Sequence, residues 1–301
     1  MRRDNSGDRC TSRDEATSRN QVTTGDGGTS RNQVTTGDGC IYCNSRGSGS
    51  GMWKKGLSIT EQIEDGKRAM ERRYKAKKFL VYFQSYTNTY TTCEKMTAMF
   101  DEALAVDSVV GMAIGTRPDC VDPEKIALIA SYTREYLVWL EYGVQSSHDR
   151  TLQLINRGHD FDCFLRAVEL TRGTSINVCA HIILGLPGEN RDMMIETAKR
   201  IGDAGIHGVK IHLLYVIKDT PLGKMYSEGR YECLSMDGYA ELVCDVIEHM
   251  PENVVIQRIT GDPHPHELMA PMWAMDKQQV FKTIRNRLEE RDIRQGNRLI
   301  Y

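Results

Sequence analysis

The chain has 301 residues, of which 40% are hydrophobic and 27% are charged, and its formal net charge is −2. A globular chain of this length buries roughly three quarters of its unfolded surface, so a sizeable core is expected, and the charge gives no general attraction to phosphate backbones. No apolar run reaches the roughly 18 residues of a membrane helix, and the polar start MRRDNSGDRC is unlike a signal peptide, so a cytoplasmic protein without membrane contact is expected.

The first 39 residues are polar and contain the sequence TSRNQVTTGDG twice, at 17–27 and at 29–39. Two copies of a short unit without an apolar face cannot stack into a solenoid. We therefore expect residues 1–39 to form a disordered, low-complexity segment without secondary structure.

From residue 58 onward, helical and strand patterns alternate. Ser58 and Glu61 have the spacing of a capping box and precede a charged helical pattern that runs to about Lys77. Asp122 and Pro123 have the properties of a helix cap and first turn. Strands are predicted at 79–84, from 109 onward, at 136–142, 176–184, 208–215 and 254–259, with helices between them, including 92–105 and two that end near Gly173 and Gly205.

Nearly continuous apolar strands joined by amphipathic helices indicate an α/β protein with a parallel sheet, either a barrel or a doubly wound sheet. In both architectures the functional residues lie at the carboxyl ends of the strands. The loops at those ends are polar or glycine-rich, at 85–90, 116–119, 143–146, 185–189 and 218–221.

Two cysteines, Cys40 and Cys43, lie in the segment CIYC beside glycine-rich sequence, which allows two thiolates to converge on one metal. The chain has nine cysteines, an odd number that fits a reducing compartment better than a disulfide framework. A structural zinc site needs two more close ligands, a thioredoxin-like pair needs a strand before it and a helix after it, and an iron-sulfur cluster needs at least one more cysteine.

Seven segments resemble, in order, motifs of the YhcC-type radical S-adenosylmethionine (SAM) family: CIYCNSRGSGSG, FQSYTNTY, TRPDC, WLEYGVQS, LINRGHDF, ILGLPGE and IHLLYVIKDTPL. That family is similar to the radical SAM domain of the Elongator catalytic subunit and to oxygen-independent coproporphyrinogen oxidases. The resemblance implies an incomplete parallel β/α barrel at 40–235, followed by a helix-strand-helix extension at 236–301. No apolar alternation precedes Cys10, so the first barrel strand is expected to be missing.

The resemblance also implies a 4Fe-4S cluster held by three cysteines, with one iron free to bind SAM. Cys40 and Cys43 match two of these ligands, and Cys10, which opens the partly matching segment CTSRD, is the candidate for the third. The duplicated segment lengthens the loop between Cys10 and the pair, at an entropic cost that grows only logarithmically with loop length.

Further residues are assigned to SAM by the same resemblance. Tyr42 would shield the cluster and present its backbone near adenine. After the fourth strand, Glu141 and Gln145 would reach the ribose or the amino group. Arg157 would bind the carboxylate through the planar fork of its guanidinium. The remaining positions are Gln84 and Asn88 near the SAM amino group, and Gly185, Pro187 and Gly188 in the turn beneath adenine.

The expected function is therefore that of a radical SAM enzyme which abstracts hydrogen from an unknown substrate, either a small molecule or an RNA, with an electron donor such as a flavodoxin or a ferredoxin. A catalytically inactive barrel that serves as a binding scaffold is the alternative, and a zinc-ribbon module is a third hypothesis. The RNA option depends on a basic run between Lys67 and Lys78. Side chains expected at the barrel mouth, where they could touch substrate, are Arg117, His181, His212, Tyr215 and Lys218.

Overall fold

The computed structural model describes residues 18–22, 39–43, 56–84 and 87–299. A seven-stranded sheet in the order β1-β2-β3-β4-β5-β6-β8 forms its centre, and every neighbouring pair in this sheet is parallel. The strands are β1 (Ser18–Val22), β2 (Phe79–Phe83), β3 (Val109–Thr116), β4 (Leu137–Gln145), β5 (Asn177–Leu184), β6 (Gly208–Leu213) and β8 (Val255–Arg258).

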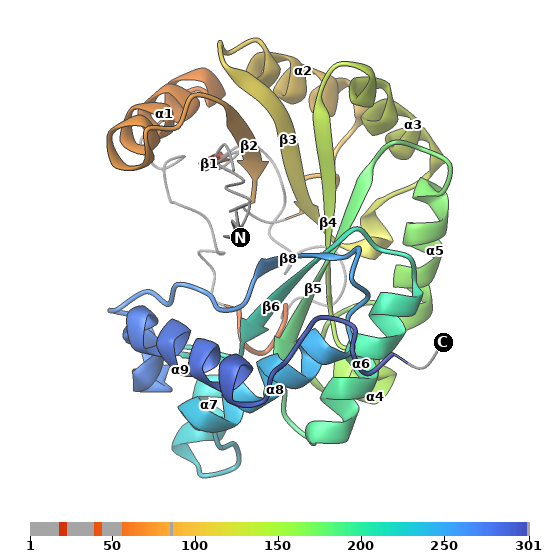
Figure 1. Ribbon diagram of the computed structural model, residues 1–301. Coiled ribbons are helices and arrows are strands. Elements are labelled where there is room, and N and C mark those ends of the chain that lie inside the picture. The colour runs from red at the N-terminus through yellow and green to blue at the C-terminus, as the bar shows by residue number, and fades with distance from the viewer. Residues whose placement is uncertain (1–17, 23–38, 44–55, 85–86, 300–301) are drawn as a thin grey trace, which may run out of the picture.

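The sheet curls with its helices on the outside, so it forms an incomplete α/β barrel that stays open between β1 and β8 (Figure 1). The predicted fold class is thereby confirmed. A small antiparallel pair, β7 (Val216–Ile217) with β9 (Leu268–Ala270), lies outside the main sheet. The helices are α1 (Ile59–Tyr74), α2 (Cys93–Leu104), α3 (Pro123–Ser131), α4 (Asp149–Leu154), α5 (Phe161–Thr171), α6 (Arg191–Asp203), α7 (Pro221–Ser227), α8 (Met236–Glu248) and α9 (Lys277–Glu290).

The capping signals in the sequence specify where several helices begin. Ser58 caps α1 in a complete capping box with Glu61, and Asp122 caps α3, whose first residue is Pro123. Such caps satisfy backbone N–H groups that have no partner within the helix. Gly205, just after α6, has a φ of +77°, a conformation that glycine adopts without strain.

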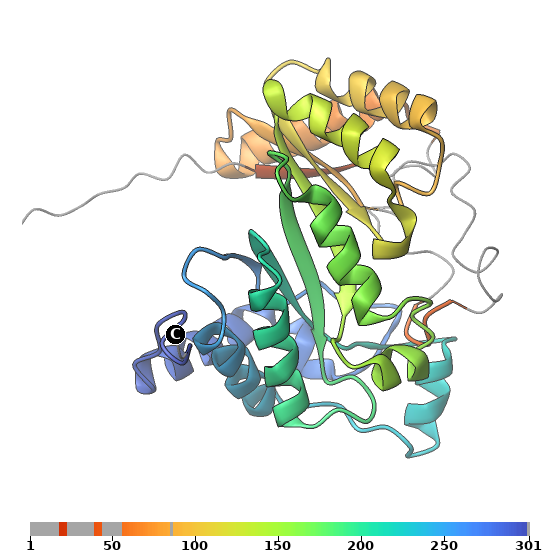
Figure 2. The ribbon, with the colours of Figure 1, turned by 90° about the vertical axis from the view of Figure 1, so that its right-hand side faces the viewer.

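The two faces of the sheet differ in chemistry. The outer face packs its apolar side chains, such as Val138, Leu140 and Tyr142 of β4, into one large core beneath the helices. Figure 2 shows these helices lying in front of the strands. The inner face has a small apolar cluster of Tyr82, Ala113, Trp139 and Cys179, and it also carries the charged and polar side chains of Glu141, His181 and Lys210. This alternation, which follows from the two-residue period of a strand, creates a polar barrel interior.

Two expectations about the strands are wrong. Residues 1–39 were expected to lack secondary structure, but Ser18–Val22 form β1, which pairs in parallel with β2 at the edge where a strand appeared to be missing. Edge pairing uses backbone groups alone, so it needs no apolar pattern. In addition, β4 extends to Gln145, three residues beyond its predicted end at Tyr142.

Candidate cofactor site

The CIYC segment is held against the barrel by backbone contacts on both sides. The Ile41 N–H donates to the Ile155 carbonyl at 3.1 Å, and the Leu222 N–H, at the start of α7, donates to the Ile41 carbonyl at 2.9 Å. A tight turn forms within the segment, since the Cys43 N–H donates to the Cys40 carbonyl at 3.0 Å. The Cys40 side chain is therefore buried, with 1% exposed, whereas Cys43 is exposed.

Arg157 joins this segment to the end of β4. Its guanidinium is fully buried and lies 3.6 Å from the Cys40 sulfur, from Nη1 to Sγ. It also donates two hydrogen bonds to the Gly143 carbonyl, one of them from Nε at 2.9 Å. A cation at this distance stabilises a thiolate, the form of cysteine that binds metals.

The charge of Arg157 is maintained although the side chain is removed from water. Burial lowers the pKa of this guanidinium, but Cys40, Tyr42 and Cys43 outweigh burial and raise it. The neighbouring His159 responds in the opposite direction, because burial and the Arg157 charge lower its pKa to about 4. This part of the site therefore combines a permanent cation with a neutral imidazole at neutral pH.

A side chain larger than that of glycine at position 143 would displace Arg157 and Gln145 from this arrangement. A Cβ atom at that position would lie 2.6 Å from Arg157 Nη2 and 2.9 Å from Gln145 Nε2. Gln145 has a φ of +74°, and the β4–β5 register shifts between Gly143 and Gln145. The irregular strand end thus brings four predicted residues together: Cys40, Tyr42, Gln145 and Arg157.

The other predicted residues have different positions. Asn88 links the ends of β2 and β3, because its Nδ2 donates to the carbonyls of Phe83 and Gly115, both at 2.9 Å. Gln84 directly follows β2. Glu141 does not follow the fourth strand as expected; it lies within β4, on the inner face of the sheet. Cys10 lies outside the described residues.

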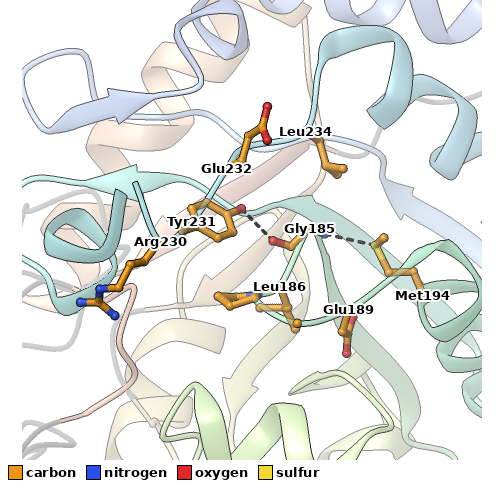
Figure 3. A pocket seen from close by; sticks show the side chains of 10 residues that line it. Gly185, Leu186, Glu189, Met194, Arg230, Tyr231, Glu232 and Leu234 are labelled. Atoms are coloured by element: carbon orange, nitrogen blue, oxygen red, sulfur yellow. Dashed lines mark hydrogen bonds between the residues drawn. The ribbon is translucent and has the colours of Figure 1, made fainter. Parts of the chain in front are cut away.

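The glycine-rich turn after β5 lines a pocket of about 240 Å³, which is shown in Figure 3. Gly185 and Gly188 both have positive φ, so the backbone can turn sharply here. Tyr231 closes the pocket from the segment after α7, and its hydroxyl donates to the Gly185 carbonyl at 2.7 Å. The pocket is lined by Gly185, Leu186, Pro187, Gly188, Glu189, Met194, Arg230, Tyr231, Glu232 and Leu234.

Two cations that face the barrel interior were not predicted from the sequence. Lys210 of β6 is buried with 1% of its side chain exposed, and its ammonium pairs with Glu141, which is fully buried. Arg258 of β8 lies beside Lys210 in the strand register. For Lys210 the available signal is a lysine within the largely apolar strand GVKIHL, since such a charge requires a partner or a function.

The donor set fits an iron-sulfur cluster in its chemistry. Two cysteines share one tight turn, and a buried guanidinium contacts one of the thiols. Within the described ranges, no group of three or more His, Cys, Asp or Glu side chains could hold a metal ion. A site with three thiol ligands therefore needs one from outside those ranges, and eight of the nine cysteines lie inside them.

This half-barrel, with two cysteines in a turn at the carboxyl ends of its strands, is the architecture of radical SAM proteins. The Radical SAM superfamily model matches residues 37–201, and the Radical_SAM C-terminal domain model matches residues 206–290. With the relatives described next, these matches show that the chain belongs to the YhcC-type radical SAM family.

The uncharacterized protein YtqA of Bacillus subtilis is 42% identical over 257 residues, which are 85% of this chain and 80% of that protein. Protein YhcC of Escherichia coli is 35% identical over 239 residues, 79% of this chain and 76% of that one. Among solved structures, an archaeal Methanocaldococcus infernus Elp3 lacking its N-terminus superimposes with a TM-score of 0.69 at 20% identity, over 82% of this chain and 62% of that one. This last similarity supports the fold alone.

Helices that could cross a membrane are absent from the part of the chain that the structure describes, since none is both long and apolar enough.

Proposed function

We propose that the chain binds a 4Fe-4S cluster through Cys10, Cys40 and Cys43, and SAM beside it, and that it abstracts hydrogen from a substrate. The observation that carries this proposal is the contact between the buried Arg157 guanidinium and the Cys40 sulfur, at the carboxyl end of β4. When bound, the cluster and SAM supply the electron transfer and the hydrogen-abstracting radical.

Cys10 is proposed as the third ligand because the segment CTSRD, which it opens, partly matches the family's first-cysteine motif. The six other described cysteines belong to other segments of the chain: Cys93, Cys120, Cys163, Cys179, Cys233 and Cys244. Burial raises the pKa of the Cys233 and Cys244 thiols to about 11, which suits buried apolar groups rather than ligands.

Arg157 has two tasks in this proposal. It stabilises the Cys40 thiolate, and it offers its remaining N–H groups to the SAM carboxylate, since a guanidinium has more N–H groups than its present contacts use. Its two hydrogen bonds to the Gly143 carbonyl fix the plane of the fork before SAM arrives. Tyr42 and Gln145 adjoin the same guanidinium. Tyr42 would shield the cluster, with its backbone near adenine, and Gln145 would reach the ribose or the amino group of SAM.

The turn of Gly185, Pro187 and Gly188 is proposed to support adenine. Its backbone can approach a planar ring closely because the two glycines lack side chains. Gln84 and Asn88 are proposed near the SAM amino group, at the end of β2. Asn88 would act there chiefly by fixing the strand end, because its amide already bridges two backbone carbonyls.

A small-molecule substrate suits the geometry better than an RNA. The exposed basic residues Lys75, Lys77 and Lys78 directly precede β2, at its amino end, whereas the CIYC turn packs near the carboxyl ends of the strands. A five-residue strand separates these two levels by roughly 17 Å. The electron donor is proposed to be a small redox protein such as a flavodoxin or a ferredoxin.

Anaerobic reconstitution of the full chain with iron and sulfide tests the proposal. Wild-type protein is expected to gain the broad blue absorbance of an iron-sulfur cluster, to bind SAM and, after reduction, to cleave it. Cys10→Ala, Cys40→Ala and Cys43→Ala should each lose the absorbance, while Cys93→Ala, on the outer helix α2, should keep it. Wild-type protein that takes up neither iron nor SAM would contradict the proposal.

A further inference from the structure

The inner face of the half-barrel carries a cluster of ionisable side chains that the proposed cofactor site leaves unused. We name it the lumen cluster: Glu141 of β4, His181 of β5, Lys210 and His212 of β6, and Arg258 of β8. Three of these residues are neighbours across adjacent strands, because His181 pairs with Lys210 in the strand register and Lys210 pairs with Arg258. The cluster borders the cofactor site, since Gly143, whose carbonyl accepts from Arg157, pairs with His181.

One part of the lumen cluster is internally neutralised. Lys210 forms an ion pair with Glu141, and the His181 Nε2–H donates to Glu141 Oε2 at 2.8 Å. The Lys210 ammonium also lies 4.1 Å from the centre of the Tyr82 ring. Glu141 is thus surrounded by donors that occupy it, and the pair adds no net charge to the lumen.

Arg258 is the unbalanced charge. It makes neither an ion pair nor a side-chain hydrogen bond with any residue in the described part of the chain, and it is only partly exposed. Its position near the other members is evident because its positive charge, secondary to burial, helps to lower the pKa of both His181 and His212. With Lys210 and Glu141 cancelling, the lumen carries a net positive charge that no described carboxylate balances.

His212 adds an unfilled hydrogen-bonding position. Its Nε2 is buried without a partner among the described residues, and its ring lies beside that of His181, with centroids 5.4 Å apart and the ring planes tilted by 40°. A buried polar atom without a partner costs free energy, so a ligand that supplies one is favoured. Burial lowers the pKa of His212 well below its ordinary value, and it is therefore a neutral imidazole that can donate one N–H.

We propose that the lumen cluster binds an anionic group, a carboxylate or a phosphate, of a small-molecule substrate, with Arg258 supplying the charge and His212 a hydrogen bond. This inference rests on the proposed function, because it places the substrate next to the cofactor site. The Lys210–Glu141 pair and His181 act as positioning residues, which hold the His212 ring and the β5–β6 surface in place. A neutral or cationic substrate would leave Arg258 uncompensated beside the partly buried imidazoles.

The test follows the imidazole signals of full-length protein labelled with ¹⁵N-histidine during titration with two probes, inorganic phosphate and acetate. His212→Gln and His181→Gln identify the two lumen signals. We expect a saturable shift of the His212 signal in wild-type protein, weakened about tenfold or more in Arg258→Gln and partly restored in Arg258→Lys. The probe that saturates at the lower concentration identifies the anion class.

Arg172→Gln is the matched control, since Arg172 is an exposed arginine that follows α5 and pairs with Glu169. It should leave the titration unchanged. No response of His212 to either anion, or an equal response in wild type and Arg258→Gln, overturns the inference. If the protein binds the cluster and SAM but the His212 signal does not respond, the anionic-substrate inference is overturned and the proposed function stands. If the His212 signal responds but the protein binds no cluster, the proposed function is overturned and the anion site stands.

Discussion

Glu141 illustrates how burial changes the meaning of a single residue. In the sequence it follows a run of apolar residues and resembles a strand-end ligand, whereas in the structure it is fully buried between Lys210 and His181. Burying an ion pair removes both charges from water, and their mutual attraction offsets the cost of desolvation, so removal of one ion leaves the other as an uncompensated buried charge. In the described structure Glu141 therefore neutralises the charge of Lys210.

Lys210→Met should consequently lower the free energy of unfolding by about 3 to 5 kcal/mol, because it leaves Glu141 buried without its cation. Urea unfolding of the purified variants measures this effect. The double variant Glu141→Leu with Lys210→Met should recover most of the loss. A Lys210→Met protein with wild-type stability would show that Glu141 reaches solvent or another cation.

At the scale of elements, the C-terminal helices depend on a dense charge network. Arg291 of the turn after α9 pairs with Glu241, Asp245 and Glu248 of α8, and the latter two carboxylates are almost fully buried. Asp245 and Glu248 also bind Arg191 and Arg298, so α6 and the chain beyond α9 join the same network. These contacts fix the C-terminal extension against the barrel.

Arg291→Gln should therefore destabilise the protein by about 1 to 3 kcal/mol, since buried carboxylates lose a shared cation. Arg172→Gln, which removes an exposed pair within one helical turn, should cost less than about 0.5 kcal/mol. Thermal and urea unfolding of both variants provide the comparison. Equal effects of the two substitutions would mean that the α8–α9 network is as solvent-screened as a surface ion pair.

At the scale of the whole molecule, buried imidazoles couple stability to pH. Burial lowers the pKa of both His181 and His159 to about 4 from an ordinary value of 6.5. The unfolded chain therefore binds protons at a higher pH than the folded one, so this contribution to stability is complete above pH 6.5 and is lost as the pH falls towards 4.

Between about pH 7 and about pH 5, each of these histidines should reduce the free energy of unfolding by about 1 to 2 kcal/mol. Urea unfolding at several pH values measures the slope. His181→Gln keeps a hydrogen-bond donor for Glu141 and should remove the contribution of one histidine from the pH dependence of the free energy of unfolding. His266→Gln, on an exposed loop, should leave this pH dependence unchanged. An unaltered slope in His181→Gln would mean that this imidazole titrates normally.

Most of the elements and their order follow from local sequence. Apolar period and capping residues such as Ser58 and Asp122 act within a few positions of the chain, so local chemistry was enough to predict β2 to β6, β8 and most of the helices between them. The CIYC pair and the motif order were sufficient to predict the family, which the comparisons confirm.

Only the tertiary structure decided which side chains meet. Arg157 and Cys40 are 117 residues apart in the sequence and come into contact only in the folded barrel. Lys210 and Glu141 lie on different strands, and no local sequence pattern predicts that they pair. The edge strand Ser18–Val22 was missed for a related reason, since its parallel pairing with β2 is a contact between segments far apart in the sequence. Long-range pairing of charges and strand edges is set by topology, and that information is not contained in any short segment of the chain.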